Sequence, residues 1–115
     1  LNLLINTAQI VLCDVPCSAT GVMRREIDQK WKLTPDKLQS LIDLQYQILV
    51  QSSEWVIVDG FLVYATCSVL LVENKDQITR FLELNPNFIF VEEKTLYPTE
   101  DGHDGFYMCK MRRIQ

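Results

Sequence analysis

Two cysteines follow short apolar runs that have the composition of buried strands. Cys17 comes just after residues 9–15, and Cys67 comes just after residues 61–65. The thiolate of cysteine is a strong nucleophile and a metal ligand. Open α/β sheets bind ligands at the carboxyl ends of their parallel strands, so we expect both thiols to lie at one edge of a sheet. Asp14, at the end of the first run, would add a carboxylate to the same edge.

These groups allow more than one kind of chemistry. A nucleophilic cysteine fits covalent catalysis, but a cysteine hydrolase would need a histidine base, and His103 is the only histidine. Zinc is the other use of thiols. Zinc-binding pairs normally sit in a turn, whereas Cys13 lies inside the first apolar run, so we expect no metal site. Cys13 and Cys109 are each expected to be small buried core residues.

The elements that would position these groups alternate as in an α/β protein. We expect strands at residues 9–15, 61–65, 88–91 and 106–111, and helices at residues 34–53 and 72–84. The first helix should begin with Thr34 as its N-cap, and Gln45 breaks its apolar stripe. Residues 55–58 are either the end of the first helix or a short apolar connector, and turns at residues 59–60 and 101–105 complete the pattern. The predicted sheet is mostly parallel and ends in an antiparallel pair.

Composition indicates one ordinary globular domain without a membrane span. The chain has 115 residues, of which 48% are apolar and 23% charged, and a net charge of -4. This charge argues against nucleic-acid binding by the whole surface, although residues 22–37 hold five cations against three acids. The chain looks cytoplasmic and its cysteines are unevenly spaced, so we expect no disulfide framework. Because the chain starts at Leu1 within an apolar segment, we expect it to be an excised piece of a longer protein.

Three segments carry a recognisable pattern. Residues 14–25 read DVPCSATGVMRR, residues 64–70 read YATCSVL and precede Glu73-Asn74, and residues 104–107 read DGFY. In order and spacing these segments resemble the cysteine motifs and the C-terminal signature of the Fmu/Sun family of RNA cytosine-5 methyltransferases, most like those acting on small-subunit (16S) ribosomal RNA. The resemblance implies that residues 1–115 form the C-terminal half of a Rossmann-like domain that binds S-adenosylmethionine.

The resemblance also implies residue roles. Cys67 would attack cytosine C6, and Cys17 would help to remove the C5 proton and release the product. Asp14 would hold the pyrimidine edge, and Asp14 and Pro16 would contribute to the cofactor site.

If the chain is part of an RNA methyltransferase, a local basic face would bind the RNA. Its members, Arg24, Arg25 and Lys32, could hold the phosphates that flank the target base.

Parts of the family pattern are absent. No glycine-rich cofactor loop follows a strand, and nothing corresponds to the N-terminal RNA-binding domain, so we expect the isolated chain to be inactive. Leu71-Val72 replaces the usual Pro-Glu before Glu73-Asn74, which weakens any role for Glu73.

The alternative hypothesis is a truncated remnant that binds RNA or protein. The second cysteine motif argues against a third possibility, a DNA cytosine-5 methyltransferase. The open edge of the first strand predicts self-association.

Overall fold

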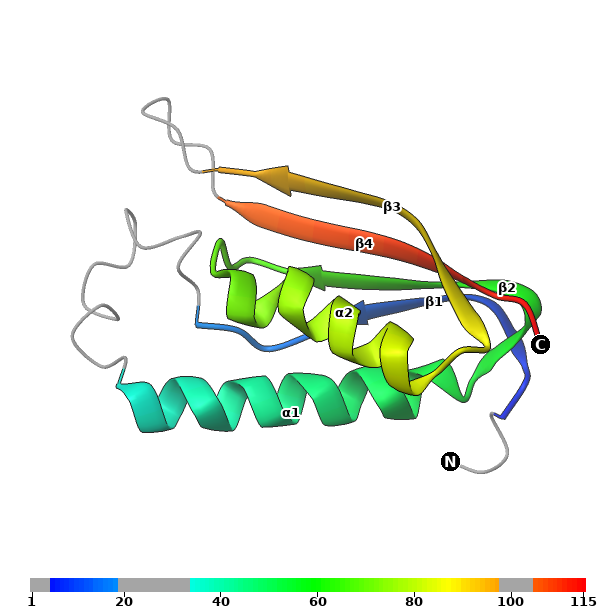
Figure 1. The fold of residues 1–115 in the computed structure, drawn as a ribbon, viewed down its shortest axis with the longest axis horizontal. Helices are drawn as coiled ribbons and strands as arrows, with labels where there is room; N and C mark the ends of the chain where they lie inside the picture. The colour runs from blue at the N-terminus through cyan, green and yellow to red at the C-terminus, as the bar shows by residue number, and fades with distance from the viewer. Residues whose placement is uncertain (1–4, 19–33, 98–104) are drawn as a thin grey trace.

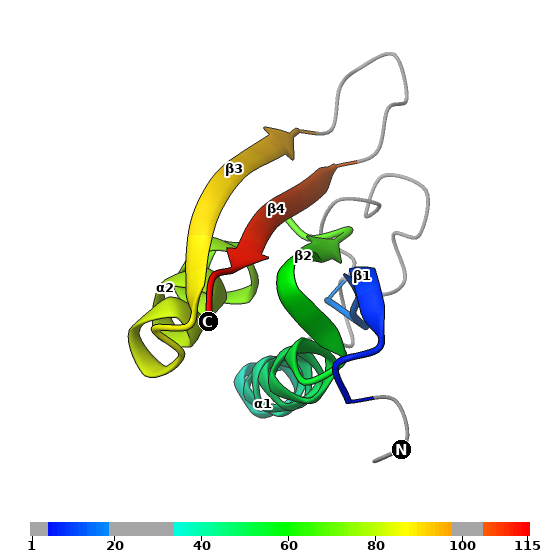
Figure 2. The ribbon, with the colours of Figure 1, turned by 90° about the vertical axis from the view of Figure 1, so that its right-hand side faces the viewer.

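The computed structural model of the chain describes residues 5–18, 34–97 and 105–115. These residues form a four-stranded sheet with two helices on one face (Figures 1 and 2). In chain order the elements are β1 (Ala8–Asp14), α1 (Pro35–Ser53), β2 (Val56–Thr66), a short 3₁₀ helix (Leu71–Glu73), α2 (Lys75–Leu84), β3 (Phe88–Leu96) and β4 (Phe106–Arg113). No helix in the described ranges has both the length and the apolar character needed to cross a bilayer.

The strand order is β1-β2-β4-β3. β1 and β2 are parallel, and α1 connects them. β4 is antiparallel to both of its neighbours, so β1, β2 and β3 run in one direction and β4 in the other (Figure 1). The predicted α/β class and its antiparallel last strand are therefore confirmed, and the described sheet is mixed, with one parallel and two antiparallel pairings.

The core lies between the sheet and the two helices. Strand residues that face the helices are cross-strand partners, so they form buried rows: Val11, Leu62 and Met111, and then Cys13, Tyr64 and Cys109. The helices contribute Leu49, Ile78 and Phe81. Both interior cysteines are small core residues as predicted, with exposed fractions of 2% for Cys13 and 0% for Cys109.

Helix α1 begins and ends where the sequence predicts. The Thr34 hydroxyl accepts a hydrogen bond from the Lys37 backbone N–H at 3.2 Å, and Pro35 occupies the first turn, where its missing N–H costs nothing. Leu49 is fully buried on the core face of the helix. Gln45, the residue that interrupts the apolar stripe, is also fully buried, so it needs polar partners inside the protein.

The predicted connector at residues 55–58 and turn at residues 59–60 are wrong, because β2 already starts at Val56. Ala8 pairs with Val56 but Ile10 pairs with Phe61, so three extra residues of β2 bulge out of the ladder. Asp59 takes a positive φ of 70° in this bulge. Gly60 is required there, because a Cβ would lie 2.8 Å from the Gln9 carbonyl oxygen. The turn-forming residues bend the strand instead of preceding it.

Three later elements also differ from their predicted bounds. The helix predicted at residues 72–84 is divided at Asn74, whose backbone is not helical and whose side chain binds the loop after β2. β3 continues to Leu96, past its predicted end at residue 91, because an edge strand with both faces exposed tolerates charge. β4 extends two residues past its predicted end. The turn predicted at residues 101–105 lies mostly outside the described residues.

The predicted self-association through β1 stays a prediction. β1 is an edge strand of the described sheet, and Ile10 and Leu12 are each 67% exposed on the face opposite the helices. We expect the 115-residue chain to form dimers or larger species in multi-angle light scattering, and Leu12→Lys to shift the mass toward the monomer. Leu84→Lys, at a 66% exposed site on α2, serves as the control. A monomer at high concentration would contradict the prediction.

Candidate active site

The two cysteine segments leave neighbouring strands at the same edge of the sheet. Cys13 pairs with Tyr64 and Asp14 with Ala65 in the parallel ladder, and the Val15 N–H donates to the Ala65 carbonyl at 3.2 Å. The arrowheads of β1 and β2 accordingly point the same way (Figure 1). Residues 15–18, here called the Cys17 loop, and residues 67–70, the Cys67 loop, therefore start side by side, as expected from the sequence.

The buried carboxylate of Glu73 joins the two loops. Its Oε1 accepts the Ser18 backbone N–H at 2.7 Å and the Gln45 side-chain amide at 3.0 Å. Its Oε2 accepts the Ser18 hydroxyl at 2.6 Å and the hydroxyl of Ser68. Glu73 is 0% exposed, and a buried carboxylate that lacks partners costs several kcal/mol. The residues that follow Cys17 and Cys67 are thus fixed to one side chain.

Gln45 connects this carboxylate to helix α1. Its amide nitrogen donates to the Pro16 carbonyl at 2.9 Å as well as to Glu73. Its amide oxygen accepts from Gln77 of α2 at 3.2 Å. The break in the apolar stripe therefore marks a buried polar network, in which one amide holds the Cys17 loop against both helices.

A second set of hydrogen bonds shapes the Cys67 loop. The Thr66 hydroxyl donates to the Asn74 side-chain oxygen at 2.6 Å and accepts the Ser68 N–H at 3.1 Å. The Asn74 amide donates to the Ser68 carbonyl at 2.8 Å, and the Leu70 N–H donates to the Ser68 hydroxyl at 3.0 Å. Cys67 itself is exposed, so its neighbours are anchored while its side chain remains accessible.

Tyr64 supports the network from the sheet. Its hydroxyl donates to the Glu73 carbonyl at 2.6 Å. Burial raises the pKa of Tyr64 far above its usual value, and the nearby Cys13 and Glu73 act in the same direction. The hydroxyl therefore remains a proton donor at neutral pH, which fixes the backbone of Glu73 below the carboxylate.

The other predicted site residues lie either at the end of β1 or outside the described part of the chain. Asp14 and Pro16 are exposed at the end of β1, and Asp14 alternates with the buried Cys13, so it lies on the sheet face opposite the helices. Arg24, Arg25 and Lys32 lie outside the described residues.

Sequence reasoning missed Glu73, Gln45 and the two serines as a unit. The signals available for them were the interrupted helix stripe and the Glu73-Asn74 pair after the second cysteine motif.

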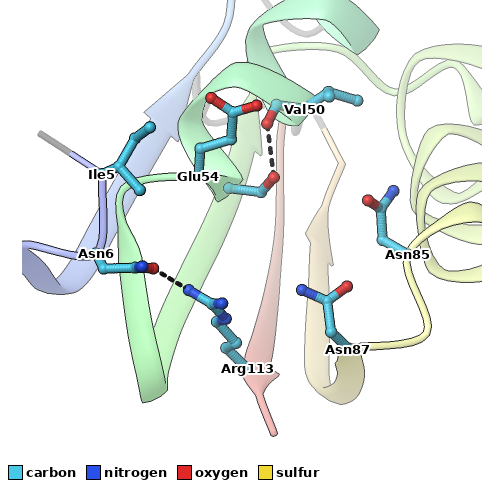
Figure 3. Close-up of a pocket in the computed structure, with 8 residues that line it drawn as sticks. Ile5, Asn6, Val50, Glu54, Asn85, Asn87 and Arg113 are labelled. Atoms are coloured by element: carbon cyan, nitrogen blue, oxygen red, sulfur yellow. Dashed lines mark hydrogen bonds between the residues drawn. The ribbon is translucent and has the colours of Figure 1, made fainter. Parts of the chain in front are cut away.

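A cleft of about 360 Å³ lies away from the thiols. Figure 3 shows Arg113 and Asn6 pointing toward one another across it, with Asn85 and Asn87 nearby. Arg113 also donates to the Val56 carbonyl at 2.6 Å, which places the cleft at the start of β2, at the opposite end of the strand from Cys67. The hydrogen bond between Asn6 and Arg113 joins the segment before β1 to the end of β4. We propose no reaction in this cleft.

The four thiols should differ in reactivity. Burial raises the pKa of Cys13 to about 11 and that of Cys109 to about 12, and both side chains lie in the core. Since only the thiolate reacts, we expect iodoacetamide at about pH 8 to label exposed Cys67 first and half-buried Cys17 more slowly, and to label Cys13 and Cys109 only in denaturant. Mass mapping of the labelled peptides measures this order; early labelling of Cys13 would contradict it.

Comparison with known proteins identifies the family. The family described as "16S rRNA methyltransferase RsmB/F" matches residues 5–112. Ribosomal RNA small subunit methyltransferase B of Pasteurella multocida is 44% identical over 90% of this chain and 26% of that protein. The chain thus spans about a quarter of the length of this relative, and a Vibrio cholerae protein of the same name shows the same proportion, 25%, at 41% identity.

Solved structures share the fold. The crystal structure of PH0851 matches with a TM-score of 0.89 and 26% identity over 95% of this chain and 27% of that one. A structure of NSun6 from Pyrococcus horikoshii with SFG matches with a TM-score of 0.73 over 90% of this chain and 29% of that one, at 21% identity. Because the family match covers nearly all of the sequence, the chain belongs to the RsmB/F family of 16S rRNA methyltransferases.

Proposed function

We propose that the full-length protein containing this chain transfers a methyl group to C5 of a cytosine in 16S ribosomal RNA, with Cys67 as the nucleophile and Cys17 as the second thiol. One observation carries the proposal: the serines that follow both cysteines bind the same buried carboxylate. A reaction at two adjacent ring carbons, C5 and C6, requires two groups at a fixed spacing. A common anchor for the two loops would hold the two thiols at such a spacing.

The chemistry follows from the weak nucleophilicity of cytosine C5. The Cys67 thiolate adds to C6, and the electron pair of the C5–C6 double bond becomes available at C5, which forms the new bond to the methyl group. Cys17, as a thiolate, then takes the C5 proton. The electron pair of the broken C–H bond restores the C5–C6 double bond and expels Cys67 as a thiolate. Exposure of Cys67 suits the approach of a base that has left its stack.

Asp14 would act on the ring rather than on the thiols. Its carboxyl group lies at the end of β1, beside the start of the Cys17 loop. A hydrogen bond between this group and the pyrimidine edge near N3 would stabilise charge that develops on the ring during addition. Asp14 is exposed on the open face of the sheet, where a base can reach it.

The methyl donor would be S-adenosylmethionine, which would supply an electrophilic methyl group: the bond between this carbon and the sulfonium sulfur would break as the bond to C5 forms, and the neutral thioether S-adenosylhomocysteine would leave. The residues present fit one wall of its site: Asp14 and Pro16 are exposed at the carboxyl end of β1, where open α/β sheets bind cofactors. The glycine-rich loop that approaches such a cofactor has no counterpart among the 115 residues.

RNA would reach the site along a basic segment. Arg24, Arg25 and Lys32 follow the Cys17 loop in sequence, and their cationic groups would hold phosphates on either side of the target base.

Trapping with RNA that contains 5-fluorocytosine tests the two thiol roles in the full-length protein. Fluorine at C5 cannot leave as a proton does, so the methylated covalent species should accumulate and migrate as a stable adduct on a denaturing gel. We expect Cys67→Ala to abolish the adduct and Cys17→Ala to retain it. With ordinary RNA, Cys17→Ala should accumulate an adduct that the wild type releases. The absence of any adduct in the wild type would favour the alternative, a protein that binds RNA without modifying it.

We also expect the isolated 115-residue chain not to methylate RNA, because it contributes only part of the proposed cofactor site. The measurement is transfer of radiolabelled methyl groups from S-adenosylmethionine to RNA, with the full-length protein as positive control. Turnover by the isolated chain would refute this.

A further inference from the structure

We propose that Glu73 is a positioning residue that couples the Cys17 loop to the Cys67 loop, so that neither thiol moves independently of the other. The inference rests on the proposed function, because it assigns Glu73 to the two-thiol reaction. It goes beyond that function by naming the group that sets the spacing between the thiols.

The carboxylate is saturated by donors from three elements. An ionised carboxylate offers about four acceptor positions, and Glu73 fills them with the Ser18 N–H, the Ser18 hydroxyl, the Ser68 hydroxyl and the Gln45 amide. Each oxygen receives two of these bonds. All of these partners are neutral, so the charge is stabilised by hydrogen bonds whose loss would leave it buried and uncompensated. Moving either loop away would break bonds at Oε2, which both loops share.

The anchor is itself held from the core. The Tyr64 hydroxyl donates to the Glu73 carbonyl at 2.6 Å, and the Glu73 N–H donates to the Leu70 carbonyl at 3.1 Å. Asn74, the next residue, binds Thr66 and Ser68. Glu73 therefore has a fixed backbone from which its side chain crosses to the Cys17 loop.

The two-residue departure at Leu71-Val72 does not disturb this arrangement. Both side chains are exposed, Leu71 by 65% and Val72 by 40%, whereas Glu73 points inward. The weakened role for Glu73 expected from the sequence is thus replaced by a defined one.

Coupling can be tested by an effect that crosses from one loop to the other. In the full-length protein, Ser68→Ala should speed iodoacetamide labelling of Cys17 about threefold or more, although Ser68 belongs to the Cys67 loop, because the shared carboxylate loses one donor and its hold on Ser18 loosens. In a Glu73→Gln background the same Ser68→Ala change should have no further effect on Cys17. Ser40→Ala, at an exposed position of α1, is the matched control and should leave Cys17 labelling unchanged.

Activity supplies a second readout. Glu73→Gln keeps the size of the side chain but presents an NH₂ donor to groups that are themselves donors. We expect its kcat for RNA methylation to fall about 100-fold, the order expected for a displacement of catalytic groups by about 1 Å, with KM for RNA changed much less. Phe81→Leu controls for lost stability and should leave kcat unchanged. It removes the ring of Phe81, whose centroid lies 5.3 Å from that of Phe88 in the core.

Two outcomes would overturn the coupling. One is a Ser68→Ala protein in which Cys17 labels at the wild-type rate, and the other is a cross-loop effect that persists in Glu73→Gln. The failure of the proposed function looks different: the wild type would then form no adduct with 5-fluorocytosine RNA while the cross-loop effect on labelling remained.

Discussion

The buried carboxylate of Glu73 is the interaction on which the site depends. A charge buried in a core persists only when hydrogen-bond donors or opposite charges surround it. Here the donors come from Ser18, Ser68 and Gln45, which belong to segments far apart in the sequence. Satisfying one carboxylate therefore specifies the positions of two loops and a helix at the same time, which hydrophobic packing could not do with the same directional precision.

This network solves a problem that parallel strands create. The ladder fixes β1 against β2 only as far as Asp14 and Ala65, and beyond that point each chain is free to diverge. In the core the next row already mixes the apolar Val15 and Tyr107 with the buried polar Thr66. Beyond the end of the ladder, side-chain hydrogen bonds hold the two loops together in place of backbone pairing. The alignment of β1 with β2 therefore extends to the loops that contain Cys17 and Cys67. Their relative position is then a consequence of both the strand pairing and the polar anchor.

The sequence reveals these two contributions unequally. Apolar runs and the Thr34-Pro35 cap predict β1 and α1 nearly to the residue, because burial and capping leave local patterns. The bulge at Asp59-Gly60 was misread, since the same residues form turns and bulges. The contacts among Ser18, Gln45 and Glu73 join residues 28 to 55 positions apart, so no local pattern shows which residues bind one another. The interrupted stripe at Gln45 indicates a polar residue on the core face but not its partner. The apolar runs indicate the positions of the two cysteines, and the family resemblance implies their roles. Their common anchor is visible only in the fold.

The two faces of β1 divide the site in a way that bears on what each part requires. Cys13 and the core side of the strand are held by residues of this chain, and through Glu73 the thiol loops are held as well. Asp14 lies on the other face with the exposed Ile10 and Leu12. Residues of this chain therefore position the two thiol loops, whereas the described residues leave the carboxylate of Asp14 exposed. Because electrostatic stabilisation of a ring depends on exclusion of water around the hydrogen-bonding group, the proposed contribution of Asp14 depends on what covers this face.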